Sequence, residues 1–231
     1  MSNIILNYIQ KDPISFIHVR ELLDRNYSII YESNNGFIIH DNDHDFTYMS
    51  FSNKDEMINE LSKKRYKHYI AYDKEIVDFY SDRDFIKVLH QFVYPSNDLF
   101  DIKEYDIRVL TNDYASFIDS FYKPIASGET SIYALNRKEV LGIFDNNNLA
   151  GIIGRHPEGC VGMLYVFEEY RGKGYAEALE KSMINKLIKE KQRVFCEVVD
   201  GNDISMHLQN KLGYVKGDKK IYWLVWKKKK Y

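Results

Sequence analysis

One stretch of the sequence constrains the fold most: an apolar segment leads directly into a glycine-rich turn and then into a long amphipathic segment. Residues 161–167, Val-Gly-Met-Leu-Tyr-Val-Phe, have the composition of a buried strand. Residues 171–176 read Arg-Gly-Lys-Gly-Tyr-Ala and open the amphipathic segment 174–190. Its apolar residues recur at helical spacing, and they are Ala178, Leu179, Met183, Ile184 and Leu187. The sequence therefore predicts a strand, a tight turn and a helix in direct succession.

The glycine-rich turn has the chemistry of an anion-binding site. The first N–H groups of a helix have no partner within the helix, and the helix dipole adds positive potential at the same end. Glycine allows the backbone to approach a diphosphate without a Cβ clash. The spacing at this turn matches neither Gly-x-x-x-x-Gly-Lys-Ser/Thr nor Gly-x-Gly-x-x-Gly, which excludes the nucleotide-hydrolase and dinucleotide loops. We predict a pyrophosphate-binding turn, and a strand-to-helix turn without a ligand is the alternative.

Two motifs in the C-terminal half resemble the signatures of the GNAT acetyltransferase superfamily. Arg171, Gly174 and Ala176 form the pattern Arg-x-x-Gly-x-Ala after a strand, which is similar to the first signature. Asn202, a predicted helix and the closing Lys-Leu-Gly-Tyr of residues 211–214 resemble the second signature. The resemblance is closest to the FR-like, glycine N-acyltransferase-like branch, in which Arg-Gly-Lys-Gly-Tyr-Ala and a serine of the last helix, here Ser205, recur.

This resemblance implies a fold and a co-substrate. The fold is α/β (α+β), with a mixed, mostly antiparallel twisted sheet, flanking helices and a splayed pair of parallel strands. The co-substrate is acetyl-CoA or coenzyme A, whose diphosphate would bind the amides of residues 171–176 and whose pantetheine arm would pair with the end of the preceding strand. The implied contact residues are Leu164, Tyr165, Val166, Arg171, Gly172, Lys173, Gly174, Tyr175, Ala176, Asn202 and Ser205. The alternatives are a strand-end cap for Asn202 and a helix-start hydroxyl for Ser205.

The resemblance also implies a catalytic acid that this chain lacks. Many members of the superfamily carry a tyrosine after the leucine of the last helix, whereas Gln209 follows Leu208 here. Glutamine supplies no titrating proton, but its amide can donate a hydrogen bond to a thiolate. An amine of pKa ~10.4 is further from its reactive form at pH 7 than a thiol of pKa ~8.5, so a base matters more than an acid. Tyr165 and Tyr214 are substitute acids, with core packing as the alternative for each.

The candidate base lies in the turn of residues 155–159. His156 titrates near neutral pH in its unperturbed state, and Glu158 can accept a proton directly or through water. The predicted catalytic residues are therefore Glu158, His156 and Gln209, and the alternative for the turn is an exposed hairpin facing solvent. Glu168 and Glu169 are further carboxylates, which we expect to serve the electrostatics of the helix start.

The chain is expected to divide into an N-terminal α/β region, residues 1–101, and a catalytic GNAT domain, residues 102–231. The N-terminal region is predicted to contain helices at 12–26, 52–64 and 73–80 and strands at 27–31, 36–40, 45–51 and 68–72, with Asn-Gly at 35–36 supplying positive φ angles. The C-terminal region is predicted to contain strands at 105–110, 140–144, 149–154, 161–167, 193–199 and 221–226, helices at 112–122, 174–190 and 204–212, and a break at Ser127-Gly128.

The shared order of elements suggests that the first region is a shortened, degenerate copy of the second, with chance recurrence as the alternative. The first region has Ser-Asn-Lys-Asp-Glu at 52–56, where the second has its glycine turn. Carboxylates there would satisfy the helix dipole and repel a diphosphate, so we expect no coenzyme at this position. The region is expected to cover the acceptor cleft, to restrict substrate size or to pair two copies of the chain as a homodimer.

Composition limits the other function classes. A formal net charge of −2 disfavours nucleic acid as a partner, and no apolar run approaches the ~20 residues that span a bilayer. Cys160 and Cys196 make no disulfide framework and no metal-ligand spacing, so we expect small core residues and no metal. The start of the chain has no pattern of a secretory signal, and a cytoplasmic location is expected.

The expected function is the transfer of an acyl group, normally acetyl, from coenzyme A to a primary amine of a small molecule, amino acid or peptide. The amine would attack the thioester directly. One alternative is a catalytically weak acyl-CoA-binding sensor that lost activity together with the tyrosine. Another is an aminoacyltransferase that uses aminoacyl-tRNA, and the near-neutral charge counts against it.

Overall fold

The computed structural model describes residues 2–66, 68–80, 85–102, 104–122 and 131–225, which form two compact units. Unit 1 comprises Met1–Val93, Glu197–Met206 and Val215–Tyr231, and unit 2 comprises Tyr94–Cys196 and His207–Tyr214. The structure thus differs from the linear division expected between residues 101 and 102. The reason is that the last strand of the chain pairs with strands of the N-terminal region.

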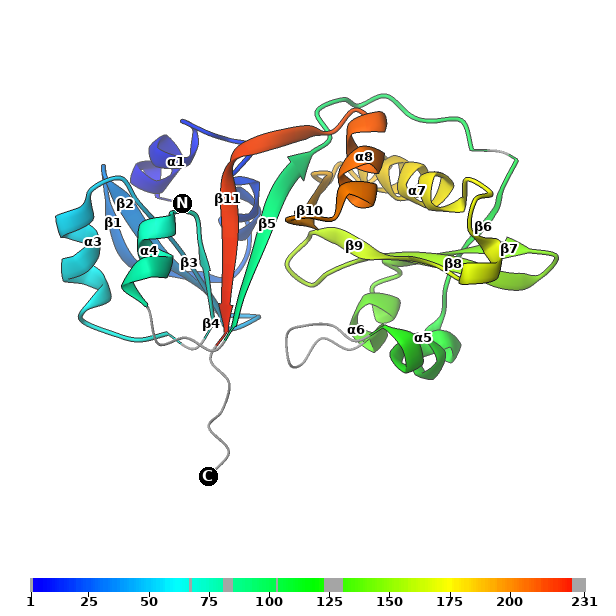
Figure 1. The fold of residues 1–231 in the computed structure, drawn as a ribbon, viewed down its shortest axis with the longest axis horizontal. Helices are drawn as coiled ribbons and strands as arrows, with labels where there is room; N and C mark the ends of the chain where they lie inside the picture. Colours follow the sequence, from blue (N-terminus) through cyan, green and yellow to red (C-terminus); the bar gives the residue numbers. More distant parts are fainter. Residues whose placement is uncertain (1, 67, 81–84, 103, 123–130, 226–231) are drawn as a thin grey trace. The chain divides into compact units, whose positions relative to one another are not determined.

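Unit 1 is built on a mixed sheet with the strand order β1-β2-β3-β4-β11-β5 (Figure 1). Its strands are β1 (Tyr27–Ser33), β2 (Gly36–Asp41), β3 (Phe46–Phe51), β4 (His68–Ala71), β5 (Phe85–Val93) and β11 (Val215–Val225). Strands β1, β2 and β3, all three predicted from the sequence, form an antiparallel meander. Strand β4 runs parallel to β3, and β11 runs antiparallel to both β4 and β5.

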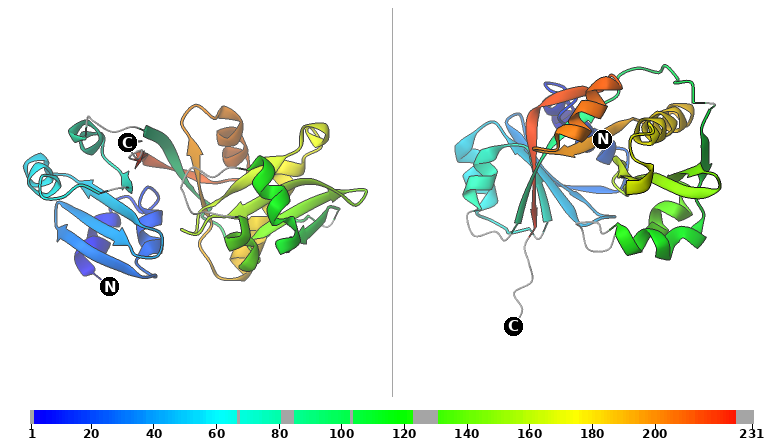
Figure 2. Two further views of the ribbon diagram at one scale, coloured as in Figure 1. Left: turned by 90° about the horizontal axis from the view of Figure 1, so that it is seen from below. Right: turned by 45° about the vertical axis from the view of Figure 1, so that its right-hand side comes forward.

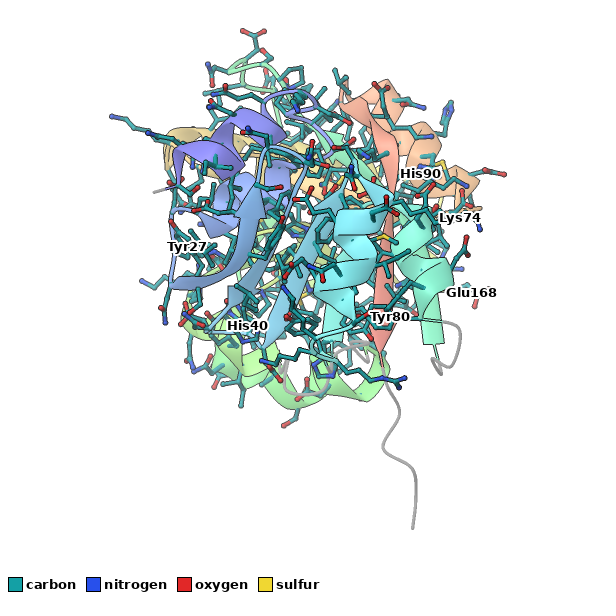
Figure 3. All side chains as sticks on the ribbon, turned by 90° about the vertical axis from the view of Figure 1, so that its left-hand side faces the viewer. Tyr27, His40, Lys74, Tyr80, His90 and Glu168 are labelled. Carbon is teal, nitrogen blue, oxygen red and sulfur yellow. The ribbon has the colours of Figure 1, made fainter. Side chains whose placement is uncertain are left out.

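Helices cover both faces of the unit 1 sheet. They are α1 (Asn3–Ile9), α2 (Ile17–Leu22), α3 (Lys54–Leu61) and α4 (Lys74–Phe79). Helices α1 and α2 lie on one face of strands β1–β3, and α3 and α4 lie on the other (Figure 3). Every residue of β3 is buried, which is what a strand between two helical layers requires. Met57, Leu61, Ile76 and Val77 of α3 and α4 pack on Ile38, Met49 and Tyr69 of the sheet.

The strands of unit 2 have the order β10-β9-β8-β7-β6. They are β6 (Asp106–Val109), β7 (Val140–Asp145), β8 (Asn148–Arg155), β9 (Val161–Val166) and β10 (Phe195–Val199), of which β10 crosses into unit 1 after Cys196. The pairs from β6 to β9 are antiparallel, and β9 and β10 are parallel. The mixed, mostly antiparallel α/β sheet with flanking helices agrees with the predicted fold class.

Helices also cover both faces of the unit 2 sheet (Figure 2). They are α5 (Ala115–Phe121), α6 (Ser131–Asn136), α7 (Tyr175–Lys189) and α8 (Asp203–Lys211), with short 3-10 turns η1 (Asn112–Tyr114) and η2 (Glu168–Tyr170). Ile118 and Leu135 of α5 and α6 pack on Val140, Ile152 and Met163 of the strands. Helix α7 covers the opposite face, and all five apolar residues predicted to form its inner face are buried. No helix within the described ranges has the length and apolar character needed to span a membrane.

Several predicted boundaries were wrong for local reasons. The helix expected from residue 12 begins at Ile17, because Asp12 Oδ1 accepts the Ser15 N–H at 3.1 Å and closes a turn first. The helix expected from residue 52 begins at Lys54, because Asn53 caps it through its side chain. Helices α1 and α6 and strand β5 were not predicted, and β11 begins six residues earlier than expected. The expected break at Ser127-Gly128 lies outside the described residues.

The two Asn-rich hairpins turn in different ways. In the β7–β8 hairpin, Asn146 and Asn147 have φ angles of 49° and 66°, which asparagine tolerates better than most residues. In the β1–β2 hairpin, none of Asn34, Asn35 and Gly36 has a positive φ, so the reason given for Gly36 was wrong. A Cβ at Gly36 would lie 2.5 Å from the carbonyl oxygen of Ser50, so glycine is needed there for close packing of the backbones.

Candidate functional site

The loop between β9 and α7 has the open backbone that the sequence predicted. Gly172 and Gly174 have φ angles of 79° and 80°, and Gly174 is the N-cap of α7 without any side-chain cap. A Cβ at Gly172 would meet nothing within 4 Å, and one at Gly174 would meet only the Tyr105 hydroxyl at 3.4 Å. Residues 171–174 are all exposed. The loop therefore presents bare backbone to solvent at the start of a fifteen-residue helix.

The start of α7 has amides available for an anion. Ala178 donates the first amide hydrogen bond of the helix, to the Gly174 carbonyl at 3.0 Å. No described group accepts a hydrogen bond from the N–H groups of residues 172–177. Successive free amides at the positive end of a helix dipole suit a phosphate or diphosphate.

Asp145, which the sequence analysis did not single out, holds this loop from the β7–β8 hairpin. Its Oδ2 accepts hydrogen bonds from Lys173 Nζ at 2.8 Å and from the Tyr175 hydroxyl at 2.9 Å. The hydrogen bond from Lys173 is the main cause that lowers the pKa of the Asp145 carboxyl. The ammonium group of Lys173 is thus directed toward Asp145, which leaves the backbone of the loop as the anion-binding element.

Strand β9 has an unpaired edge beyond its first residue. It pairs with β10 only at Cys196 and Val161, whereas its pairing with β8 continues to Val166. The described part of β10 therefore offers no partner to Leu164, Tyr165 and Val166, in agreement with the splayed pair that the resemblance implied. An extended pantetheine chain pairs with an edge of this kind by strand addition.

A β-bulge lies in the middle of this edge. Gly162 opposes Gly154 and Tyr165 opposes Ile152, so two residues of β9, Met163 and Leu164, face the single residue between them on β8. Met163 has a φ of 53°, in the left-handed region that a methionine rarely adopts. Such bulges turn a strand and gather next to active sites, and nothing in the local sequence announces this one.

Asn202 caps the start of a helix and not the end of a strand, which was the alternative considered for it. Its Oδ1 accepts the N–H of Ser205 at 3.2 Å at the start of α8. Asn202 is exposed and Ser205 is half-buried, and both fall in the part of the chain that packs with unit 1. Their contact with coenzyme A stays a prediction.

The turn that carries the candidate bases is closed by hydrogen bonds between its own residues. The His156 N–H donates to the Cys160 carbonyl at 2.8 Å, and the buried Arg155 donates from Nε to the Gly159 carbonyl at 2.7 Å. Glu158 is only 7% exposed, which rules out the exposed hairpin considered for it.

The imidazole of His156 lies against the backbone of β9. A Cβ at Gly162 would lie 2.3 Å from His156 Nε2, so the glycine makes room for the ring. Gly162 directly follows Val161, the last residue of β9 that pairs with β10. The histidine therefore lies beside the point where the two parallel strands separate.

Gln209 is buried against α7 and does not face open solvent. It is 3% exposed, and its Nε2 donates to Glu180 Oε1 at 3.0 Å. One N–H of the amide considered as a donor to a thiolate is thus used by Glu180, a residue that the sequence analysis overlooked. Burial raises the pKa of the Glu180 carboxyl to about 7, and the hydrogen bond from Gln209 opposes this only in part.

The other aromatic and sulfur residues of the sequence analysis are packing groups. Tyr214 is buried, and burial raises the pKa of its hydroxyl well above the usual value, which makes it a poor proton donor near neutral pH. Tyr165 packs its ring on Phe121 and Phe167, with centroids 4.9 and 5.3 Å away. Cys160 and Cys196 are buried core residues, as predicted.

The corresponding helix start in unit 1 is satisfied by its own side chains. Asn53 Oδ1 accepts the Glu56 N–H at 3.0 Å. The Glu56 carboxylate accepts hydrogen bonds from the hydroxyls of Ser33 and Tyr31 and from the Asn35 amide, and the bond from Ser33 is the main cause that lowers its pKa. A diphosphate would meet a carboxylate here, which supports the expectation that this unit does not bind coenzyme A.

Comparisons with known proteins agree with this geometry. Residues 140–224 match the model of the FR47-like protein family. No curated protein matches the sequence. The crystal structure of a Drosophila protein has 18% identity and a TM-score of 0.61, with 82% of this chain and 73% of that chain covered.

Two bacterial structures share the fold over nearly the whole chain. A GNAT-family acetyltransferase from Colwellia psychrerythraea has 12% identity, a TM-score of 0.57 and coverage of 96% of this chain and 94% of that chain. A GCN5-related N-acetyltransferase-like protein from Streptococcus suis has 12% identity, a TM-score of 0.54 and coverage of 90% and 93%. The residues that match the family model include the glycine loop and α8, and these structures show that the chain shares its fold with proteins described as GNAT-family and GCN5-related acetyltransferases.

Proposed function

We propose that the protein transfers an acyl group, preferably acetyl, from coenzyme A to a primary amine of a small molecule, amino acid or peptide. The observation that carries this proposal is the loop of residues 171–174, whose exposed backbone leads into free amides at the start of α7. The strand that leads into this loop is β9, and its edge is not paired with β10 beyond Val161. Together they suit a ligand that has a diphosphate at one end and an extended, amide-containing arm.

The proposed reaction is a direct aminolysis. The nitrogen lone pair of the acceptor forms a C–N bond to the thioester carbon, and the C–S bond breaks as the tetrahedral adduct collapses. The amine loses a proton to His156 or Glu158, and the coenzyme leaves as a thiolate. A base near the splay point of β9 is the larger requirement, because the amine is further than the thiol from its reactive form at neutral pH.

The two candidate bases are distinguished by mutation. We expect Glu158→Gln or His156→Ala, whichever removes the base, to lower kcat on the order of a hundredfold with little change in coenzyme A affinity. Glu168→Gln and Glu169→Gln remove exposed carboxylates that follow the opposite end of β9 and serve as controls. Steady-state kinetics and calorimetry of all four variants separate turnover from binding. Full activity in both turn variants would make the turn purely structural.

The second candidate function is an acyl-CoA sensor without turnover. It is favoured by one observation: Gln209 stands where many family members carry a tyrosine, its amide donates to Glu180, and burial raises the pKa of the Tyr214 hydroxyl well above its usual value. Release of free thiol from acetyl-CoA in the presence of a panel of amines and amino acids decides between the two. Tight coenzyme binding with no thiol release for any acceptor identifies the sensor, and no coenzyme binding refutes both functions.

A further inference from the structure

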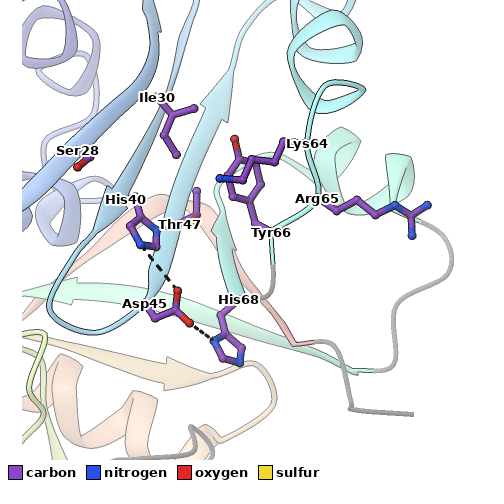
Figure 4. A pocket seen from close by; sticks show the side chains of 9 residues that line it. All are labelled: Ser28, Ile30, His40, Asp45, Thr47, Lys64, Arg65, Tyr66 and His68. Carbon is purple, nitrogen blue, oxygen red and sulfur yellow. Dashed lines mark hydrogen bonds and ion pairs between the residues drawn. The ribbon is translucent and has the colours of Figure 1, made fainter. Parts of the chain in front are cut away.

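Unit 1 contains a pocket of about 360 Å³ that has no part in the proposed reaction (Figure 4). Ser28 of β1, His40 of β2 and Thr47 of β3 form a row across it, because these residues oppose one another in the strand register. Ile38 and Met49 are two positions along the same strands and belong to the core beneath α3 and α4. The pocket is therefore the polar end of the face that these helices cover.

A structured turn places a carboxylate over this row. Buried Asp41 accepts the N–H groups of Asp43 at 3.0 Å and His44 at 3.2 Å, and this fixes the β2–β3 turn. Asp45 follows with a φ of 57°, in the left-handed region. Its two carboxylate oxygens lie 3.8 Å from His40 Nε2 and 3.8 Å from His68 Nδ1. These separations are too long for hydrogen bonds, so Asp45 stands between two imidazoles without using their N–H groups.

The other polar groups of the pocket are donors from several directions. His40 Nδ1 lies 3.0 Å from the hydroxyl of Thr47, a residue that is 1% exposed. Lys64 extends over the ring of Tyr66, with Nζ 5.2 Å from the centroid, and points into the pocket (Figure 4). Arg65 points away from it (Figure 4). One exposed ammonium, two imidazoles and three hydroxyl-bearing side chains thus surround a space that has a single carboxylate at its edge, and one of the hydroxyls, that of Ser28, donates to Asn42 Oδ1 at 3.1 Å.

We propose that this pocket binds the phosphate group of a small phosphate monoester. A tetrahedral phosphate accepts hydrogen bonds from scattered point donors such as Lys64 and His40. A planar carboxylate is matched better by an arginine fork, and Arg65 does not provide one here. Ile30 and Tyr66 supply the apolar wall for the organic part, and Asp45 accepts a hydrogen bond from one of its hydroxyls.

Two further observations limit the occupant. The pocket volume is at the lower end of the range for small-molecule sites, which fits a metabolite and not a polymer. Among the described residues no group of three or more His, Cys, Asp or Glu side chains is placed to hold a metal ion. The proposal does not depend on the acyltransferase function, because every lining residue belongs to unit 1 and the glycine loop belongs to unit 2.

Calorimetry on the full chain tests the site with glycerol 3-phosphate, inorganic phosphate and glycerate as probes. We expect saturable binding of glycerol 3-phosphate that is tighter than that of phosphate, and none of glycerate. Lys64→Gln should raise the dissociation constant about tenfold, the usual effect of losing one charged hydrogen bond. Lys63→Gln is the matched control, because it removes a neighbouring ammonium that is paired with Glu60 at 2.6 Å. Gly174→Val should leave this affinity unchanged.

Each contrary result overturns the assignment. If the binding of glycerol 3-phosphate does not saturate, the proposed site does not exist. If glycerate binds more tightly than glycerol 3-phosphate, the site does not recognise phosphate. Equal losses in Lys63→Gln and Lys64→Gln indicate diffuse attraction to basic surface. If Gly174→Val lowers the affinity for glycerol 3-phosphate and Lys64→Gln does not, the phosphate binds at the glycine loop and not in this pocket. Lys64 is exposed, so its variant should keep the thermal unfolding midpoint of the parent.

Discussion

Replacing Glu180 with glutamine should raise the free energy of unfolding above neutral pH by about 3 kcal/mol. Burial in α7 raises the pKa of this carboxyl from 4.5 to about 7, so the folded protein holds the proton more tightly than the unfolded chain. The contribution of the neutral acid is complete below pH 4.5 and is lost as the pH rises through 7. Glutamine is neutral at every pH, and its carbonyl can still accept the Gln209 amide.

Urea unfolding at pH 5, 7 and 9 measures this effect as a difference between the two proteins. The parent should lose stability relative to Glu180→Gln between pH 5 and 9. Glu177→Gln is the control on the same helix: Glu177 pairs with Lys181 at 2.8 Å and with Lys211 at 2.5 Å, and these hydrogen bonds, the Lys181 bond first, lower its pKa. Its contribution has the opposite sign and is lost as the pH falls. Identical pH slopes for the parent and Glu180→Gln would contradict a buried acid.

Gly174→Val should weaken coenzyme A binding by more than about tenfold, since it affects the loop in two ways. The β-branched side chain would have to adopt a φ of 80°, where residues with a Cβ are strained. It would also fill the open space through which a diphosphate approaches the free amides. Calorimetry with coenzyme A measures the loss, and the thermal midpoint reports whether the fold survives.

The matched control is Gly213→Val, which places the same side chain on a backbone with a φ of 86° at the end of α8. A Cβ at that position would meet only a Tyr94 carbon at 4.0 Å. If both valine variants lose stability and only Gly174→Val loses coenzyme, the loop is the binding element. If Gly174→Val binds coenzyme A as tightly as the parent protein, the loop is not the diphosphate-binding site.

The loop and its helix could be predicted from the sequence because their determinants are local. Gly174 precedes the helix that it opens, and the apolar spacing of α7 fixes the buried face without reference to the rest of the chain. The meander of β1, β2 and β3 was predictable for the same reason, since short turns set its register. For Gly36 the local sequence suggested a positive φ, and only the close packing against Ser50, which is distant in the sequence, explains the glycine.

The groups that the sequence analysis missed depend on contacts between distant residues. Asp145 meets Lys173 across 28 positions, and Glu180 meets Gln209 across 29. Neither pair has a periodicity that a linear pattern could reveal. The burial of Gln209 follows from the contact with α7, and the raised pKa of Glu180 follows from the burial. Sequence therefore located the candidate site but not the network that supports it.

The position of β11 has a consequence for how the chain acquires its structure during synthesis. Strand β11 occupies the place between β4 and β5, so these two strands, complete by residue 93, have no direct pairing with each other in the sheet order. The N-terminal unit must wait with two unpaired strand edges while more than a hundred further residues emerge from the ribosome. Its sheet closes only when residues 215–225 arrive, and a ribosome that stalls before them leaves a polypeptide prone to pair with its neighbours.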